Sequence, residues 1–185
     1  MSAQEPPPTP PSARPGAHPV PARRLPGAVL LARLAARTAP SGARRIALAP
    51  RVGSVAEIRG AKRTLVVTFR RSGTPVPTPV WAAYAGGVFY VRSERRSGKL
   101  KRLRNDARVL LAPCTVRGNP LGAPLEARGF LVAPGDELSA ERALAERYGL
   151  GRECFERTMD IMRIEMCYLR FEPGAWQQEP LRPER

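Results

Sequence analysis

The sequence predicts a mainly β domain, in which about five or six antiparallel strands form a small barrel flanked by three or four helices. Short β-branched and apolar runs follow one another from residue 63 to residue 173, with glycine or proline between most of them. All tryptophan, tyrosine and phenylalanine residues lie after residue 50, whereas 11 of the 21 prolines lie within residues 1–50. We therefore expect a disordered tail over residues 1–50, one folded domain over residues 51–176 and a second disordered tail over residues 177–185.

The first expected element of the domain is a short helix over residues 54–62. Ser54 can cap this helix, and Glu57, three residues later, can complete a capping box. Residues 63–69, RTLVVTF, follow as a β-branched strand, and the chain then turns around Gly73.

Two further extended stretches follow, over residues 75–85 and residues 88–92, with a tight turn at Gly86 and Gly87 between them. Together with the first strand they are expected to form a three-stranded antiparallel meander. The prolines at positions 75, 77 and 79 lack amide donors. The second strand is therefore expected at a sheet edge, or with its backbone turned toward a ligand.

The remaining predicted elements are three helices and three strands. Glycines at positions 149 and 151 are expected to end one helix, and a second helical piece then begins. In order, the predicted elements are a basic helix within 97–106, strands over 107–114 and 123–132, helices over 139–148 and 152–161, and a final strand over 163–173.

Several kinds of chemistry are excluded by composition. The only histidine, His18, lies in the expected tail, so the domain has no histidine triad, histidine base or histidine metal site. Cys114, Cys154 and Cys167 show no CxxC spacing, which argues against a disulfide framework or a zinc site and fits a reducing cytoplasm. Cys114 could be a reactive thiol, although a small buried hydrophobic residue is the more common case. We assign no catalytic residue and no metal ligand.

No apolar run reaches the ~18 residues that a membrane span needs. Residues 25–39, LPGAVLLARLAARTA, are rich in arginine and free of acidic residues, so they resemble the start of a targeting segment or an amphipathic helix. Their distance from Met1 argues against a signal peptide, and part of a disordered tail is the favoured interpretation.

The charge pattern indicates an anionic partner. The formal net charge is +15, and the residues after position 50 include 24 basic and 15 acidic side chains. The stretch SGKLKRLRND, 97–106, places Lys99 and Lys101 in the first turn of a helix capped by Ser97, where the helix dipole disfavours a cation unless an anion binds there. A solvated charge run and a nucleic-acid footprint are the alternatives, and no aromatic platform supports the second.

Three motifs, in this order and spacing, carry a family resemblance: GTPVPTPVW, SGKLKRLRND and APCTVRGNPLG. They resemble the pyridoxamine 5'-phosphate oxidase-like split-barrel family, in particular its branch of coenzyme F420-dependent oxidoreductases, and the likeness covers residues 54–173. The resemblance implies a six-stranded antiparallel split β-barrel of the FMN-binding type. It also implies a cytoplasmic homodimer that transfers a hydride from reduced F420 to a small-molecule acceptor, without a nucleic-acid or membrane partner.

The resemblance also implies a cofactor site. Gly98-Lys99 replaces the Arg-Lys pair of the family's oxidases, so one phosphate contact typical of flavin mononucleotide (FMN) binders is missing. The anionic tail of F420 would suit the arginines at positions 95, 96, 102 and 104. An FMN-dependent oxidase and a non-catalytic flavin- or deazaflavin-binding protein remain alternatives. The implied residues are Thr78, Pro79, Val80 and Trp81 along the ring, Ser97 and Lys99 at the phosphate, Lys101 and Arg102 near it, and Arg92 and Ser93 in the same groove.

Overall fold

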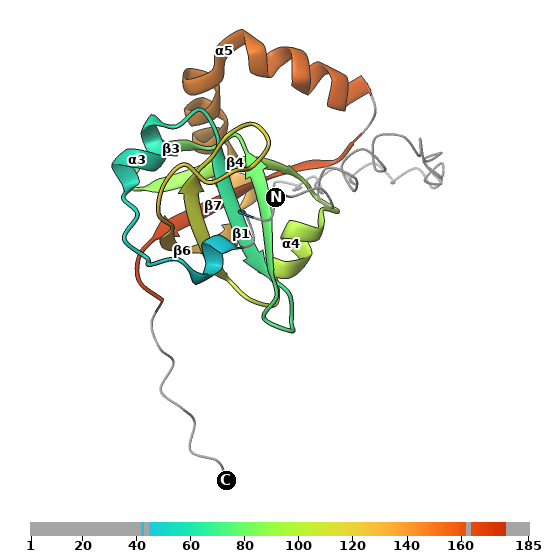
Figure 1. Cartoon of the computed structure of the whole chain (residues 1–185). Helices are drawn as coiled ribbons and strands as arrows, with labels where there is room; N and C mark the ends of the chain where they lie inside the picture. Colours follow the sequence, from blue (N-terminus) through green and yellow to red (C-terminus); the bar gives the residue numbers. More distant parts are fainter. Residues whose placement is uncertain (1–41, 43–44, 162–163, 177–185) are drawn as a thin grey trace, which may run out of the picture.

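The computed structural model describes residues 42, 45–161 and 164–176, with side chains omitted over residues 150–161. The predicted targeting or amphipathic segment at 25–39 lies outside these residues. The elements are η1 (Ile46–Leu48), α3 (Val55–Gly60), β1 (Thr64–Phe69), β2 (Pro75–Val80), β3 (Ala83–Ala85), β4 (Val88–Glu94), α4 (Gly98–Leu103), β5 (Arg108–Pro113), β6 (Leu125–Leu131), η2 (Pro134–Asp136), α5 (Glu137–Ile161) and β7 (Met166–Pro173). Four consecutive strands precede α4, and the last strand follows α5 (Figure 1).

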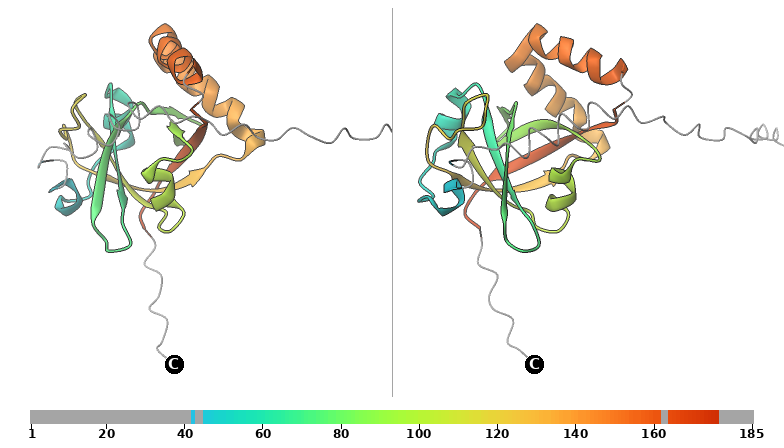
Figure 2. Two further views of the ribbon diagram at one scale, coloured as in Figure 1. Left: turned by 90° about the vertical axis from the view of Figure 1, so that its right-hand side faces the viewer. Right: turned by 45° about the vertical axis from the view of Figure 1, so that its right-hand side comes forward.

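The strands form one curled antiparallel sheet in the order β2-β1-β5-β6-β7-β4-β3. Its two edge strands, β2 and β3, are consecutive in the chain, and only Trp81 and Ala82 join them. Because one residue extends a chain by at most about 3.6 Å, the edges come within about 11 Å of each other at this point. The sheet therefore curls until its edges approach, as Figures 1 and 2 show.

The expected count of six strands is wrong, because the structure has seven. The predicted strand over residues 75–85 is divided into β2, which pairs with β1, and β3, which pairs with β4. The predicted meander is therefore two hairpins at opposite edges of the sheet. A local pattern reports that the backbone is extended, but it does not report which strand the backbone pairs with.

The edge position predicted from the prolines is confirmed, since β2 pairs with β1 alone. The prolines at 75, 77 and 79 alternate along β2, so their nitrogens lie on the same side of the strand. That side faces away from β1, because the intervening residues carry the amides that bond to the ladder. The free edge of β2 can therefore accept hydrogen bonds but cannot donate them, which hinders the addition of another strand.

Local sequence signals explain the shorter elements. Ser54 accepts a hydrogen bond from the Glu57 amide, and the Glu57 carboxylate accepts one from the Ser54 amide, so the predicted capping box begins α3. Gly86 and Gly87 turn between β3 and β4 with positive φ angles of 57° and 86°. The helix of residues 137–161 is broken at Gly149, whose φ is 50° and ψ is −139°, which agrees with the predicted break.

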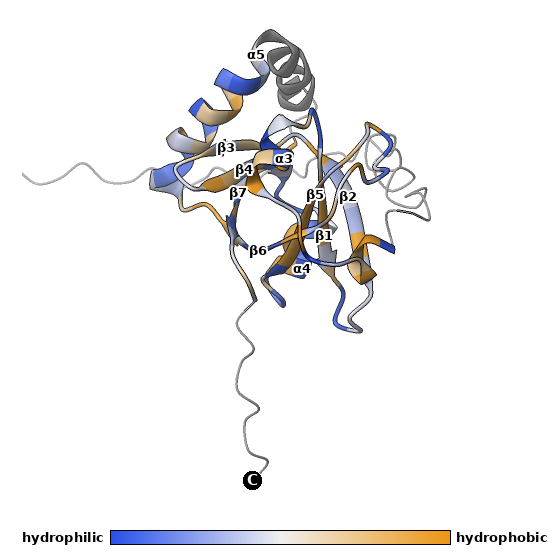
Figure 3. Cartoon of the chain, turned by 60° about the vertical axis from the view of Figure 1, so that its left-hand side comes forward, coloured by the Kyte–Doolittle hydropathy of each residue, from blue (hydrophilic) through white to orange (hydrophobic). Residues whose placement is uncertain are grey.

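Three apolar clusters hold the elements together. The largest lies on the face of β1 that carries Val66, and α4 adds Leu100 and Leu103 to it. A second lies on the opposite face of β1 and includes Ile46, which is buried although it belongs to the expected tail. A third lies between α5 and the hairpin of β3 and β4. Figure 3 shows hydrophobic residues along the middle strands. Among the helices of the described residues, none combines the length and the hydrophobicity that crossing a membrane requires.

Candidate functional site

A group of polar side chains lies where the end of β4 meets the start of α4. Ser93 follows Phe89 and Val91 on the buried face of β4, as the alternation of a strand requires. The Ser93 and Ser97 hydroxyl oxygens lie 3.2 Å apart, and the Ser97 oxygen also accepts a hydrogen bond of 3.3 Å from the Leu100 amide. The two hydroxyls are thus held together by the strand end and by the cap of α4.

Lys99 is the most unusual member of this group, because only 7% of its surface is exposed. Its Nζ donates a hydrogen bond of 3.4 Å to the Ser93 Oγ. Burial and, to a lesser degree, the positive charge of Arg102 lower its pKa to about 8, while Cys167 acts in the opposite direction. In the part of the chain that the structure describes, no carboxylate forms an ion pair with Lys99.

Arg102 adds a second cation from the same helix. Its Nε donates a hydrogen bond of 2.7 Å to the Oγ1 of Thr68, a buried residue of β1. Its guanidinium also lies against Gly98, because a Cβ atom built there would be 3.0 Å from Arg102 Nη1. Partial burial and the nearby charge of Arg70 lower the pKa of Arg102.

We call Thr68, Ser93, Ser97, Lys99 and Arg102 the hydroxyl-cation cluster. It unites three hydroxyls with two cations, and the charge of Arg102 lowers the pKa of Lys99. Such an arrangement is electrostatically unfavourable until an anion enters, and it offers the donors that an oxyanion needs. The cluster rests on side chains from β1, β4 and α4, and α4 itself has only six residues.

The strand predicted to lie along a cofactor ring is β2. Thr78 pairs with Val66 and Val76 pairs with Thr68, so Thr78 and Val80 lie on the same sheet face as the hydroxyl-cation cluster. At about 3.3 Å per residue, Thr78 lies about 7 Å along the strand from the level of Thr68. Pro79 lies on the opposite face, where its ring is near Gly118.

Trp81 lies at the far end of β2, about five strand residues from the level of Thr68. Its indole packs against Tyr148 of α5, with ring centroids 5.7 Å apart. The Arg63 guanidinium lies 4.3 Å from the indole centroid. The Tyr148 hydroxyl accepts a hydrogen bond of 3.1 Å from the Ala82 amide and donates one of 2.9 Å to the Ala82 carbonyl. In this structure Trp81 therefore belongs to a clamp that holds the link between the two sheet edges.

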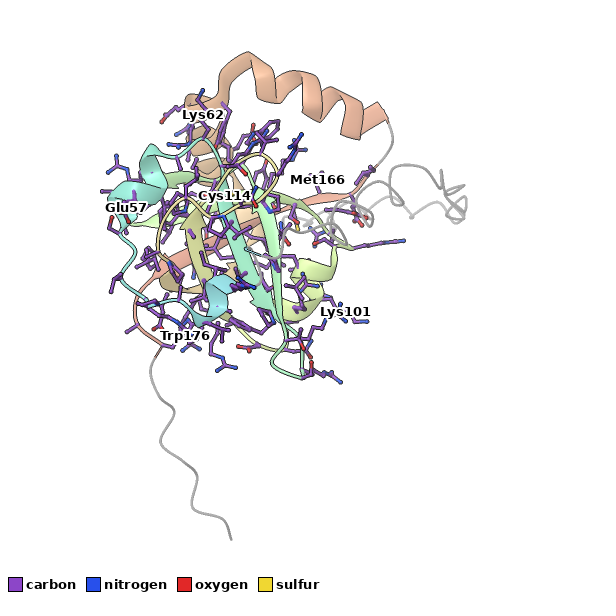
Figure 4. All side chains as sticks on the ribbon, in the orientation of Figure 1. Glu57, Lys62, Lys101, Cys114, Met166 and Trp176 are labelled. Carbon is purple, nitrogen blue, oxygen red and sulfur yellow. The ribbon has the colours of Figure 1, made fainter. Side chains whose placement is uncertain are left out.

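Arg92 and Lys101, two other predicted site residues, lie apart from the cluster. Arg92 is adjacent to Ser93 on β4, so its side chain projects to the opposite face, where its guanidinium lies 5.9 Å from the Tyr168 ring. The Tyr168 hydroxyl donates a hydrogen bond to Glu141 of α5. Lys101 is exposed, and Figure 4 shows its side chain directed outward from α4.

Sequence reasoning missed Thr68, Arg63 and Tyr148. Thr68 could have been found, because it interrupts the apolar run of residues 65–69 at an inward position shared with Val66. No comparable signal marks Arg63 or Tyr148, since their contacts join residues 18 and 67 positions apart in the chain.

The two cysteines whose side chains the structure describes are buried. Burial raises the pKa of the Cys114 thiol to about 11, which leaves almost no thiolate at neutral pH. The Cys167 thiol donates a weak hydrogen bond of 3.4 Å to the Ser93 carbonyl, and burial raises its pKa as well. Both thiols are therefore packing groups, as was favoured for Cys114.

No protein-family model matches the chain, and no curated protein matches it. Three solved structures illustrate what its backbone is similar to. The first is a heme storage protein from Vibrio cholerae, with a TM-score of 0.49 and 14% sequence identity over 66% of this chain and 89% of that one. The second is a FAD-binding protein from Mesorhizobium loti, with a TM-score of 0.46 and 14% identity over 65% of this chain and 84% of that one. The third is an F420 reductase, with a TM-score of 0.44 and 19% identity over 66% of this chain and 94% of that one. These values are too low to assign the chain an activity.

Proposed function

We propose that this protein is an oxidoreductase that binds coenzyme F420 at the hydroxyl-cation cluster and along β2, and that uses its reduced form to reduce a small-molecule acceptor. The observation that carries the proposal is Lys99. A buried ammonium costs several kcal/mol unless it is paired, and among the described residues its only hydrogen bond is to a neutral hydroxyl. A phosphate group would supply the missing negative charge.

The residues present fit such a cofactor. The Ser93 and Ser97 hydroxyls and the Lys99 ammonium would hold the phosphate through charge-assisted hydrogen bonds. Thr78 and Val80 lie on the same face of the sheet, so the β2 backbone and these side chains would orient the ring. Trp81 would act through the clamp, which fixes the end of β2 against α5. Arg95, Arg96 and Arg104 lie near in the sequence and would attract an anionic tail.

When bound, the reduced deazaflavin would supply the hydride, so the reaction would not require a catalytic histidine from the domain. The chain's own contribution is to bind, orient and shield the cofactor. We further propose that the protein is a cytoplasmic homodimer with a tail before the folded domain, and we extend the domain expected over residues 51–176 to include the buried Ile46.

The proposal is tested by fluorescence titration of the full-length protein with oxidised F420 and, separately, with FMN at near-physiological salt. Micromolar or tighter binding of F420, with weaker binding of FMN, is the expected result. Binding of neither would refute the proposal. Consumption of reduced F420 with a panel of acceptors, followed by absorbance, separates an enzyme from a storage protein, which would bind the cofactor without oxidising it. Sedimentation velocity tests the dimer.

One observation favours FMN as a second candidate. The position before Lys99 lacks the arginine that the resembled oxidases carry, but the Arg102 guanidinium occupies space beside Gly98. The cation is therefore present, although it comes from a different residue. An FMN enzyme would be yellow when purified, and its reduced form would react with oxygen.

A further inference from the structure

We infer that Gly98 and Arg102 act as a pair that selects a phosphate ligand, with the glycine making room for an arginine that completes the anion site from the next helical turn. The inference deepens the proposed function, because it names the groups that recognise the phosphate. Neither residue's partnership was visible in the sequence.

The geometry of α4 brings the pair together. Residues four positions apart lie on one face of a helix, so the Arg102 side chain extends back over Gly98. A Cβ atom at position 98 would lie 3.0 Å from Nη1 and 3.9 Å from Cζ of Arg102. A side chain at this position would therefore press against the guanidinium and shift it by a few tenths of an ångström.

The Arg102 guanidinium is anchored at one end and available at the other. Its Nε is bonded to Thr68 Oγ1 at 2.7 Å, which fixes the plane of the group. Within the described part of the chain, its two terminal nitrogens form no hydrogen bond and no ion pair. A guanidinium held in this way presents a pair of parallel donors, the geometry that suits two oxygens of a phosphate.

The surrounding charges agree with this role. Lys99 and Arg102 repel each other, and Arg70 adds a third positive charge next to Arg102. The Ser97 side chain, next to Gly98 in the chain, is joined to Lys99 through Ser93. A phosphate that enters the cluster would therefore meet two cations, and its negative charge would reduce the repulsion between them.

Five variants of the full-length protein test the inference: Gly98→Ala, Arg102→Ala, Arg102→Lys, Lys99→Ala and, as a control, Arg128→Ala, which removes an exposed arginine of β6. Each is titrated with FMN and with riboflavin, which differ only in the phosphate, and with oxidised F420. The melting temperature is also measured in inorganic phosphate and in chloride of equal ionic strength.

We expect Arg102→Ala and Arg102→Lys to weaken the binding of the phosphorylated ligand by about tenfold or more, because lysine lacks the planar pair of donors. Gly98→Ala should weaken it about threefold or more while leaving the melting temperature equal or higher, since alanine favours the helix. Riboflavin binding should not change in any variant, and the control should behave like the wild type.

The outcomes separate this inference from the proposed function. If a flavin or F420 binds and Lys99→Ala weakens it, but the Gly98 and Arg102 variants bind like the wild type, the pairing is wrong and the proposed function stands. If inorganic phosphate raises the melting temperature only when Arg102 is present, yet neither cofactor binds, the pairing stands and the proposed function is wrong. If phosphate has no effect and neither cofactor binds, both are overturned.

Discussion

Lys99 should destabilise the cofactor-free protein, and replacing it with methionine should make the protein more stable at pH 7. Methionine has a similar length and no charge, so it can fill the same buried space. The pKa of Lys99 falls from 10.5 to about 8 on folding. At 1.36 kcal/mol per pH unit, this corresponds to a penalty of about 3 kcal/mol at pH 7.

The penalty has a defined pH dependence. Between pH 8 and pH 10.5 the unfolded chain keeps the Lys99 proton while the folded chain releases it, so the unfolded state binds more protons. The free energy of unfolding therefore rises with pH across this window, by up to about 1.4 kcal/mol per unit, and the penalty is fully present below pH 8. The Lys99→Met variant should lack this rise.

The assay is urea unfolding of the wild type and the Lys99→Met variant at pH 7, 8, 9 and 10, with no cofactor present. The buried thiols of Cys114 and Cys167 have raised pKa values, so they lower stability above pH 9 in both proteins. When the free energies of unfolding of the two proteins are subtracted at each pH, most of the contribution of the thiols cancels. The variant should be more stable by about 3 kcal/mol at pH 7, with the difference shrinking toward pH 10. A variant that is less stable at pH 7 would refute the account of Lys99 as an unpaired buried charge.

Three further predictions concern Lys99 in the cofactor-bound protein, the Tyr148 hydroxyl and Ile46. The affinity for F420 should fall by up to about tenfold per pH unit above pH 8, because the cofactor-free protein then loses the Lys99 proton that binding requires, and it should level off once the anion-bound Lys99 also loses its proton. Lys99→Ala should abolish this dependence and weaken binding by about 1.5 to 3 kcal/mol, and the same fluorescence titration measures both. Tyr148→Phe should lower the free energy of unfolding by about 1 to 2 kcal/mol, because it removes both hydroxyl bonds to Ala82. Tyr90→Phe is the matched control and should change it little, since the Tyr90 hydroxyl has no hydrogen-bond partner among the described residues. A chain that starts at residue 42 should have the same free energy of unfolding as the full chain. A chain that starts at residue 51 should have a free energy of unfolding lower by about 1.5 to 3 kcal/mol, because it lacks the buried side chain of Ile46. Equal melting curves for the two truncated chains would contradict this prediction.

Several elements were predictable from the sequence because their causes are local. The capping box at Ser54 begins α3, paired glycines make the turn between β3 and β4, and Gly149 interrupts α5. Each of these signals depends on hydrogen bonds or backbone angles within a few residues. The edge position of β2 was predictable for the same reason, since proline lacks an amide wherever it lies.

The pairing of the strands was decided by tertiary structure alone. Residues 75–80 and 83–85 are strands, yet Trp81 and Ala82 between them carry the chain from one edge of the sheet to the other. That change of partner depends on the curl of the whole sheet and on the Tyr148 hydroxyl, which is 66 residues from Ala82 in the chain.

In the candidate site, too, some features were predictable from the sequence and others were not. The identity and spacing of the residues were enough to predict that Ser97 caps a helix, that Lys99 and Arg102 follow it, and that the domain has no histidine. The burial of Lys99 against Ser93 depends on tertiary contacts, as do the position of Arg102 over Gly98 and its bond to Thr68. The reason is physical: charge and capping belong to the residues themselves, whereas burial and the direction of a long side chain depend on which surfaces the fold brings against them.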